Sequence, residues 1–209
     1  MALPATHLRD PVVPIMTPLD RLPLRVRPAR PLDDDALFEF CRSNPDLRIE
    51  RAAGGDLIIM APTGSETGRR NFALTGQLAA WVAKDGTGVG FDSSTGFVLP
   101  NGAERSPDAA WVPRPRWDAL STAERGKFAP LCPDFVAELR SPSDGLADLE
   151  AKMEEYARNG ARLGWLIDPV ERTVHVYRSG MAPVTLRDPA TVDGGDVLPG
   201  FRLDLASIW

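Results

Sequence analysis

The chain has 209 residues, of which 43% are hydrophobic and 25% charged, and its formal net charge is −5 at pH 7. This composition is typical of a folded globular protein, and the length favours one domain with extensions over two full domains. The negative net charge argues against a protein coated with basic surface for broad nucleic-acid binding. It leaves room for an acidic metal site beside a local basic track.

The amino-terminal sequence argues against secretion and membrane insertion. No stretch reaches the roughly 18 to 20 consecutive apolar residues that span a bilayer, and residues 1–29 contain proline and arginine where a signal peptide is apolar. We therefore expect a cytoplasmic protein that does not bind membranes. The two cysteines, Cys41 and Cys132, have no CxxC spacing, and His7 and His175 lie far apart. This pattern disfavours a disulfide framework and a structural zinc site.

The first 30 residues are rich in proline and show no sustained periodicity, which disfavours both a helix and a central strand. We predict that residues 1–30 form a proline-rich flexible arm and that residues 31–209 form the folded domain. Aspartates at 33–35 favour the start of a short helix, which Pro45 ends.

A hairpin and a helix are predicted next. The short apolar runs 47–53 and 56–60 are separated by two glycines, which favours a β-hairpin. Thr63 and Glu66 have the spacing of a capping box, and the apolar residues that follow recur at helical intervals. We therefore predict a helix over about 66–84.

Short segments bounded by turn residues follow. Residues 88–91, 96–99 and 106–112 are predicted to form successive strands of an antiparallel meander. Residues 113–133 are expected to cross the surface, with a short helix at 121–126. The remaining predicted elements are a strand at 134–140, a second core helix from 143 to about 159, and strands at 163–167, 173–177 and 184–186.

Two acids carry the candidate chemistry. Asp108 and Glu138 each interrupt an apolar run, and a buried unpaired carboxylate is costly unless a cation or a hydrogen-bond donor lies nearby. A divalent ion stabilises charge on both oxygens of phosphodiester hydrolysis, and Mg²⁺ needs only one or two carboxylates. Two alternatives stay open: Asp108 could bond its own backbone at a strand end, and Glu138 could form a salt bridge with an arginine such as Arg140.

Several short motifs occur in one order along the chain, and together they are more specific than any one of them. They are Met60-Ala-Pro-Thr-Gly64, Ser106-Pro-Asp108, Glu138-Leu-Arg-Ser-Pro-Ser143, Lys152 with Tyr156 and Gly160, Trp165-Leu-Ile-Asp168-Pro169, and Leu198-Pro-Gly-Phe201. With these motifs the chain resembles the Uma-two family of restriction endonucleases, within the PD-(D/E)xK nuclease superfamily. The resemblance covers roughly residues 30–209.

The resemblance implies a restriction-endonuclease-like α/β fold (α+β mixed), in which a mixed β-sheet is flanked by helices. It also implies that Asp108, Glu138 and the backbone carbonyl of Leu139 bind Mg²⁺, or alternatively Mn²⁺, with DNA as the substrate and water as the nucleophile. Many nucleases of the superfamily dimerise. A homodimer is therefore considered, with the arm and the apolar tail ending at Ile208 and Trp209 as its interface.

The sequence departs from the superfamily at one position. The superfamily places a lysine two residues beyond the acidic ligand, but this chain has Arg140 there. A guanidinium stays protonated near neutral pH, so Arg140 can bind phosphate but can hardly accept a proton. Lys152 is the candidate replacement, because it lies about 80° from the centre of the apolar stripe of its helix. The alternative for Lys152 is an ordinary surface pair with Asp148 or Glu155.

Further candidates lie on the first core helix. Glu66 is a third acid, since similar nucleases often place a glutamate there to hold metal-bound water, but the capping box with Thr63 explains it without a metal. Arg69 and Arg70, like Arg140, are candidate contacts to the DNA backbone. The alternative is that these arginines belong to a solvated face.

We therefore predict a metal-dependent endonuclease that hydrolyses phosphodiester bonds in DNA, with Asp108 and Glu138 binding the ion and Lys152 positioning water. The alternative is a catalytically decayed nuclease-fold module that binds nucleic acid or a protein partner. Arg140 in the lysine position and the acidic net charge motivate that alternative.

Overall fold

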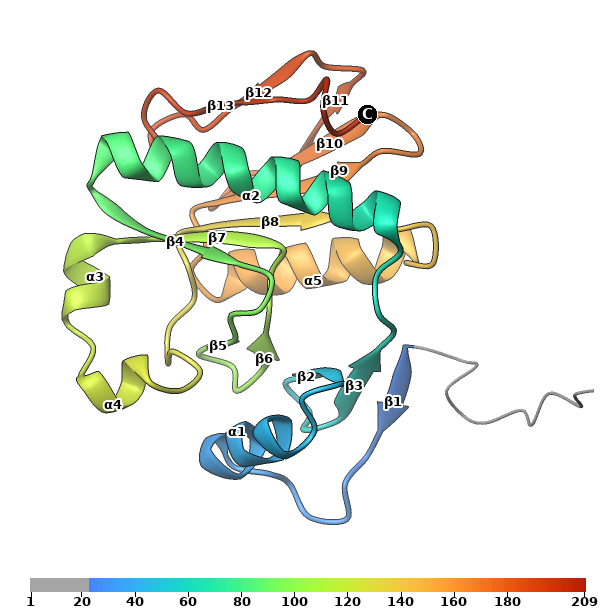
Figure 1. Cartoon of the computed structure of the whole chain (residues 1–209), viewed down its shortest axis with the longest axis vertical. Coiled ribbons are helices and arrows are strands. Elements are labelled where there is room, and N and C mark those ends of the chain that lie inside the picture. Colours follow the sequence, from blue (N-terminus) through green and yellow to red (C-terminus); the bar gives the residue numbers. More distant parts are fainter. Residues whose placement is uncertain (1–22) are drawn as a thin grey trace, which may run out of the picture.

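The structure, a computed structural model, describes residues 23–209, and a six-stranded mixed sheet forms its centre (Figure 1). The sheet has the order β11-β10-β9-β8-β7-β4. Its strands are β4 (Gly88–Asp92), β7 (Ala109–Pro113), β8 (Phe135–Leu139), β9 (Leu163–Asp168), β10 (Thr173–Arg178) and β11 (Val184–Arg187). Within this sheet β8 and β9 are parallel, and the helix α5 (Leu146–Arg158) connects them; the other neighbours are antiparallel.

Helices α2 (Ser65–Asp85) and α5 cover opposite faces of this sheet (Figure 1). Leu74 and Leu78 of α2 pack on the strand residues of one face, whereas Met153 and Tyr156 of α5 pack on those of the other, including Ala110 and Val136. Successive residues of a strand point to opposite faces. Glu138, two positions from Val136, is therefore directed to the α5 face, and Asp108 lies at the end of the neighbouring strand, just before β7.

A second, smaller sheet lies beside the first and has the order β1-β3-β2-β6-β5 (Figure 1). Its strands are β1 (Leu24–Val26), β2 (Arg48–Arg51), β3 (Leu57–Met60), β5 (Phe97–Val98) and β6 (Glu104–Arg105), and α1 (Asp34–Ser43) packs on it. The chain passes from β6 to β7 through Ser106 and Pro107. The two sheets consequently meet at the start of β7, beside Asp108.

The remaining elements are α3 (Arg114–Asp118), α4 (Thr122–Arg125) and a ribbon of β12 (Thr191–Asp193) and β13 (Arg202–Asp204). The carboxyl-terminal segment packs on the α2 side of the main core, where Ile208 is fully buried. Trp209 packs against the same core and donates a hydrogen bond to the Pro189 carbonyl at 3.1 Å. The tail considered as a dimer interface thus packs on its own chain.

The fold class, the two core helices, the short helices at 34–43 and 122–125 and the β2–β3 hairpin agree with the sequence predictions. Gly55 in the hairpin turn has a φ of 86°, a left-handed conformation that glycine adopts at low cost. No helix within residues 23–209 has both the length and the apolar character needed to cross a lipid bilayer.

Two predictions need correction. The segment 96–99 does not join an antiparallel meander: β5 pairs with β6 in the smaller sheet, and β4 pairs directly with β7. Strands of two residues carry no periodicity, so contacts distant in sequence decide their partners. In addition, part of the predicted flexible arm, Leu24–Val26, is the edge strand β1, which pairs with β3. The prediction for residues 1–22 lies outside the described residues.

Gly88 in β4 tests the packing of the main sheet. A Cβ at Gly88 would lie 2.3 Å from the Trp111 ring, which is 4% exposed and confined by Trp81. We expect Gly88→Ala to lower the free energy of unfolding by about 1 to 3 kcal/mol, because the buried indole must move. Gly76, in the exposed middle of α2, meets nothing within 4 Å. Gly76→Ala should instead stabilise by about 0.5 to 1 kcal/mol. Denaturant unfolding measures both, and equal effects would contradict this packing.

Candidate active site

A cavity of about 500 Å³ lies where the two sheets meet. It is lined by residues from β2, from the start of α2, from β8 and the loop after it, and from α5. Asp108, Glu138, Leu139 and Lys152 all contribute to its wall. The structure therefore brings together the principal residues that the sequence singled out.

Asp108 lies immediately before β7 and is 6% exposed. Its Oδ2 accepts a hydrogen bond from the Leu139 backbone N–H at 2.8 Å, and its Oδ1 accepts one from Asn71 Nδ2 at 3.2 Å. The Arg48 guanidinium lies 3.6 Å from Oδ1. These partners belong to β8, α2 and β2, so the alternative of a turn residue bonded to its own backbone is wrong.

Glu138 on β8 lies opposite Asp108. The register pairs Ala109 with Ala137, which places Asp108 and Glu138 at neighbouring positions on the same face of the sheet. Glu138 Oε1 accepts a hydrogen bond from the Tyr156 hydroxyl at 3.0 Å and lies 2.9 Å from Lys152 Nζ. Both contacts involve Oε1, which leaves Oε2 as the oxygen available to a cation.

The surroundings of Glu138 oppose its ionisation. Burial raises the pKa of Glu138 to about 7; the Lys152 ammonium works against this rise, and the carboxylates of Asp108 and Glu50 add to it. The predicted alternative, a salt bridge from Glu138 to Arg140, is wrong, because Lys152 is the cation at this carboxylate. A carboxylate destabilised by burial and by like charges is a favourable place for a bound cation.

Lys152 lies on α5 with its Nζ 2.8 Å from Glu50 and 2.9 Å from Glu138. The alternative of a surface pair with Asp148 or Glu155 is therefore wrong. Burial would lower the pKa of Lys152, but the two carboxylates outweigh it and raise that pKa. Lys152 is consequently an ammonium at neutral pH, a hydrogen-bond donor rather than a proton acceptor.

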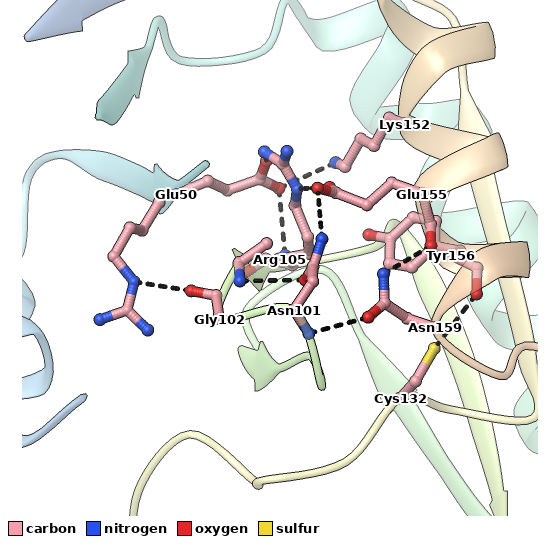
Figure 2. Close-up of polar contacts among 12 residues, drawn as sticks. Glu50, Asn101, Gly102, Arg105, Cys132, Lys152, Glu155, Tyr156 and Asn159 are labelled. Carbon is pink, nitrogen blue, oxygen red and sulfur yellow. Dashed lines mark hydrogen bonds and ion pairs between the residues drawn. The ribbon is translucent and has the colours of Figure 1, made fainter. Parts of the chain in front are cut away.

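Two residues of the site, Arg48 and Glu50 on β2, were missed by the sequence analysis. Both point to the site because they are two positions apart in one strand. Glu50 is 2% exposed; it accepts hydrogen bonds from Lys152 and from Arg105 Nη1 at 3.1 Å (Figure 2). Burial alone would raise the pKa of Glu50, but Lys152 and Arg105 lower it. Charged residues alternating with the buried Ile49 were the signal that could have identified them.

Glu104 of β6 is another buried acid near this cluster, and it is fully buried. Burial raises the pKa of Glu104 to about 8, and repulsion from Glu50 adds to the rise. Its side chain is therefore mostly protonated at neutral pH and adds little negative charge.

The candidates at the start of α2 have other partners. The helix is capped by Gly64 without a side-chain hydrogen bond, so the predicted capping box of Thr63 and Glu66 does not form. Glu66 lines the cavity but pairs with Arg69 at 2.8 Å and with Arg70 at 3.3 Å. Arg69 also donates a hydrogen bond to the Ser207 carbonyl at 2.7 Å.

Arg140 is engaged elsewhere and is not among the residues that line the cavity. Its Nη1 lies 2.6 Å from Asp168, which is fully buried and accepts hydrogen bonds from the backbone of Val170 and Glu171. These hydrogen bonds hold the turn between β9 and β10. The arginine in the superfamily's lysine position neutralises a buried aspartate, and Lys152 supplies the cation at Glu138.

The donors that the site offers suit a hard divalent ion. Within the described part of the chain no group of three or more histidine, cysteine and acidic side chains has metal-binding proximity. Asp108, Glu138 and the Leu139 carbonyl nevertheless provide oxygen atoms, and Mg²⁺ commonly takes one or two carboxylates and keeps several waters. The residues present therefore fit Mg²⁺ or Mn²⁺.

The chain is similar to known proteins in sequence and in fold. A family model described as "Uma2: Putative restriction endonuclease" matches residues 34–206. The chain belongs to the Uma2 family. A crystal structure described as a putative nuclease belonging to DUF820, from Anabaena variabilis ATCC 29413, aligns with a TM-score of 0.68 at 20% identity. The alignment covers 85% of this chain and 97% of that chain, and at this identity it shows a shared fold. No curated protein matches the chain significantly.

The ion pair of Arg140 predicts a structural effect. Arg140→Ala leaves the Asp168 carboxylate buried without its cation, so we expect the free energy of unfolding to fall by about 3 kcal/mol. Arg158→Ala removes a pair with Glu154 in which both side chains are more than half exposed, and should change stability by less than about 0.5 kcal/mol. Denaturant titration compares the two. A loss no larger for Arg140→Ala than for Arg158→Ala would contradict the assignment.

Proposed function

We propose that the protein is a metal-dependent endonuclease that hydrolyses phosphodiester bonds in DNA. One observation carries the proposal: Asp108 just before β7, Glu138 of β8 and Lys152 of α5 line one cavity. Membership of the Uma2 family supports nuclease activity. The solved neighbour, itself described as a putative nuclease, supports the fold on which such a site is built.

In this proposal, Asp108, Glu138 and the Leu139 carbonyl hold Mg²⁺ or Mn²⁺. The bound ion supplies charge stabilisation to the attacking and leaving oxygens of the phosphodiester. The Leu139 N–H donates to Asp108, and the N–H and C=O of one strand residue point to the same side of the strand. The contact therefore supports a Leu139 carbonyl directed to the same side as the Asp108 carboxylate.

Lys152 is proposed to position water. Its ammonium lies within hydrogen-bond distance of Glu138, so a water or phosphate oxygen bound beside that carboxylate can accept a hydrogen bond from it. Because Lys152 is cationic, it orients the attacking water and stabilises charge that develops on oxygen. This role needs no proton transfer to the lysine.

Arg48 is proposed to contact the phosphate that is cut. It lines the cavity next to Asp108, and its side chain keeps 31% of its surface exposed. Its Nε is a buried donor that finds no hydrogen-bond partner among residues 23–209. Guanidinium groups bind phosphate oxygens well. Arg69 and Arg70, which pair with the cavity-lining Glu66, remain proposed contacts to the DNA backbone. Arg140 is a weaker candidate for such a contact, because it is paired with Asp168.

A decayed module that only binds nucleic acid is the alternative function. It was motivated by the arginine at position 140, but the ammonium of Lys152 lies 2.9 Å from Glu138. That contact favours an active enzyme.

Plasmid cleavage tests the proposal. Wild-type protein with Mg²⁺ or Mn²⁺ should nick or linearise supercoiled DNA, and chelation of the metal should stop the reaction. Asp108→Asn and Glu138→Gln each remove a charged ligand, so each should lower kcat/KM at least about 100-fold, which corresponds to roughly 2.7 kcal/mol of transition-state stabilisation. Glu154→Gln, an exposed carboxylate on α5, is the matched control and should cut normally.

The same assay separates the alternatives. Arg48→Ala should mainly raise KM for DNA, because it removes a substrate contact. Wild-type protein that binds DNA in a salt-dependent manner without cutting it would support the decayed module. Cleavage that persists in both ligand variants would place the active site elsewhere.

A further inference from the structure

Lys152 is held from two sides by carboxylates of different sheets. Its Nζ donates a hydrogen bond to Glu50 Oε1 of β2 at 2.8 Å and forms an ion pair with Glu138 Oε1 of β8 at 2.9 Å. The ammonium side chain is 12% exposed. A lysine side chain has four rotatable bonds and loses roughly 1.5 to 2 kcal/mol of rotamer freedom when it is fixed. The carboxylates of Glu50 and Glu138 together therefore restrict the Lys152 ammonium more than either one alone would.

Glu50 is itself held in a fixed orientation. Its Oε1 accepts a second hydrogen bond, from the Ser106 backbone N–H at 3.0 Å, and its Oε2 accepts one from Arg105 Nη1 at 3.1 Å. The donors to the two oxygens of this buried carboxylate thus lie at the end of β6 and in the connection to β7. Ser106 is two residues before Asp108, so Glu50 ties the lysine to the same connection that carries the first proposed metal ligand.

Arg105 extends the contacts back to α5, as Figure 2 shows. Its Nε lies 2.6 Å from Glu155, which is three residues after Lys152 on the helix. Glu50, Arg105, Glu155 and Lys152 therefore connect β2, β6 and α5 through buried or nearly buried ion pairs. Of the two carboxylates that pair with Arg105, Glu50 also contacts Lys152, whereas Glu155 accepts its other hydrogen bond from Asn101.

We propose that Glu50 is a positioning residue for DNA cleavage, a role that rests on the proposed function. Glu50 fixes the direction of the Lys152 ammonium, so that the lysine contacts Glu138 through Oε1 and leaves Oε2 for the cation. The smaller sheet thereby completes the active site of the larger one. Glu50 acts through Lys152 and makes no contact with the DNA.

A double-mutant cycle tests this coupling. Glu50→Gln keeps the size of the side chain but removes its charge, and it should lower kcat about 10- to 100-fold, since small misplacements of catalytic groups cost that much. KM should stay within about 2-fold. In a Lys152→Met background, Glu50→Gln should change kcat by less than about 2-fold, because a residue that acts through the lysine has no effect without it. Equal losses in both backgrounds would overturn the proposal.

Glu155→Gln is the matched control, because it removes the other carboxylate of Arg105 and leaves the contact between Glu50 and Lys152 intact. It should leave kcat within about 3-fold of wild type. If Glu50→Gln does not fold, Glu50→Asp takes its place: it keeps the negative charge but shortens the reach to Lys152. Glu50→Asp with wild-type kcat would overturn the proposal.

A second readout does not depend on cleavage. Acetylation of each lysine by a small anhydride can be followed by mass spectrometry, with the exposed Lys84 as internal reference. Glu50→Gln should raise the acetylation rate of Lys152 relative to Lys84 at least about 5-fold, because the reactive neutral amine forms more readily without that carboxylate. Glu155→Gln should leave the rate unchanged. If the wild-type protein cuts no DNA and Glu50→Gln still shows this rise, the nuclease proposal is refuted and the contact between Glu50 and Lys152 is supported. An unchanged rate refutes the role of Glu50.

Discussion

The burial of Lys152 between Glu50 and Glu138 is the interaction on which the site depends. Moving ions out of water is expensive, and a buried charge is tolerated only when partners and hydrogen bonds compensate for it. Lys152 lies on α5, and its two partners lie on β2 and β8, which belong to different sheets. The site can therefore form only when the smaller sheet is docked against the larger one. Removing one partner would leave an uncompensated buried charge.

The two faces of the main sheet differ in composition. Its α2 face is an apolar core closed by the carboxyl-terminal segment, with Trp165 and Phe201 stacked at 5.8 Å. Its α5 face is apolar near the middle of the strands but carries Glu138 near the end that meets the smaller sheet, with Asp108 just before β7 beside it. The apolar part fixes the positions of the strands and of α5. Rigid elements then hold the carboxylates and the ammonium in fixed positions, as the proposed catalysis requires.

Much of this arrangement could be predicted from the sequence because it follows local rules. Helical periodicity identified α2 and α5, and the glycine pair identified the β2–β3 hairpin. Asp108 and Glu138 stood out as acids within apolar strands, and Lys152 stood out by its place on the flank of an apolar stripe. The family motifs joined these residues into one hypothesis, which the cavity now gives a common location.

The rest depends on contacts between distant segments. Nothing near Glu50 in the sequence reveals that Lys152 lies 102 positions away and within hydrogen-bond distance. The pairing of β5 with β6, two residues each, is likewise decided by packing. Arg140 was considered as a partner of Glu138 and as a phosphate contact, because its actual partner, Asp168, lies on the neighbouring strand β9, 28 positions away. The capping box failed since Gly64, rather than Thr63, precedes the first turn of α2.

A crystal of the protein soaked in Mn²⁺ tests the central claim most directly, because anomalous scattering locates the ion without knowledge of the substrate. The account predicts one anomalous peak between the carboxylates of Asp108 and Glu138, about 2.0 to 2.3 Å from their oxygens and close to the Leu139 carbonyl. It also predicts that the Lys152 ammonium stays on Glu50 when the ion is bound. No peak at these oxygens at saturating Mn²⁺, or a peak at other residues, would contradict it.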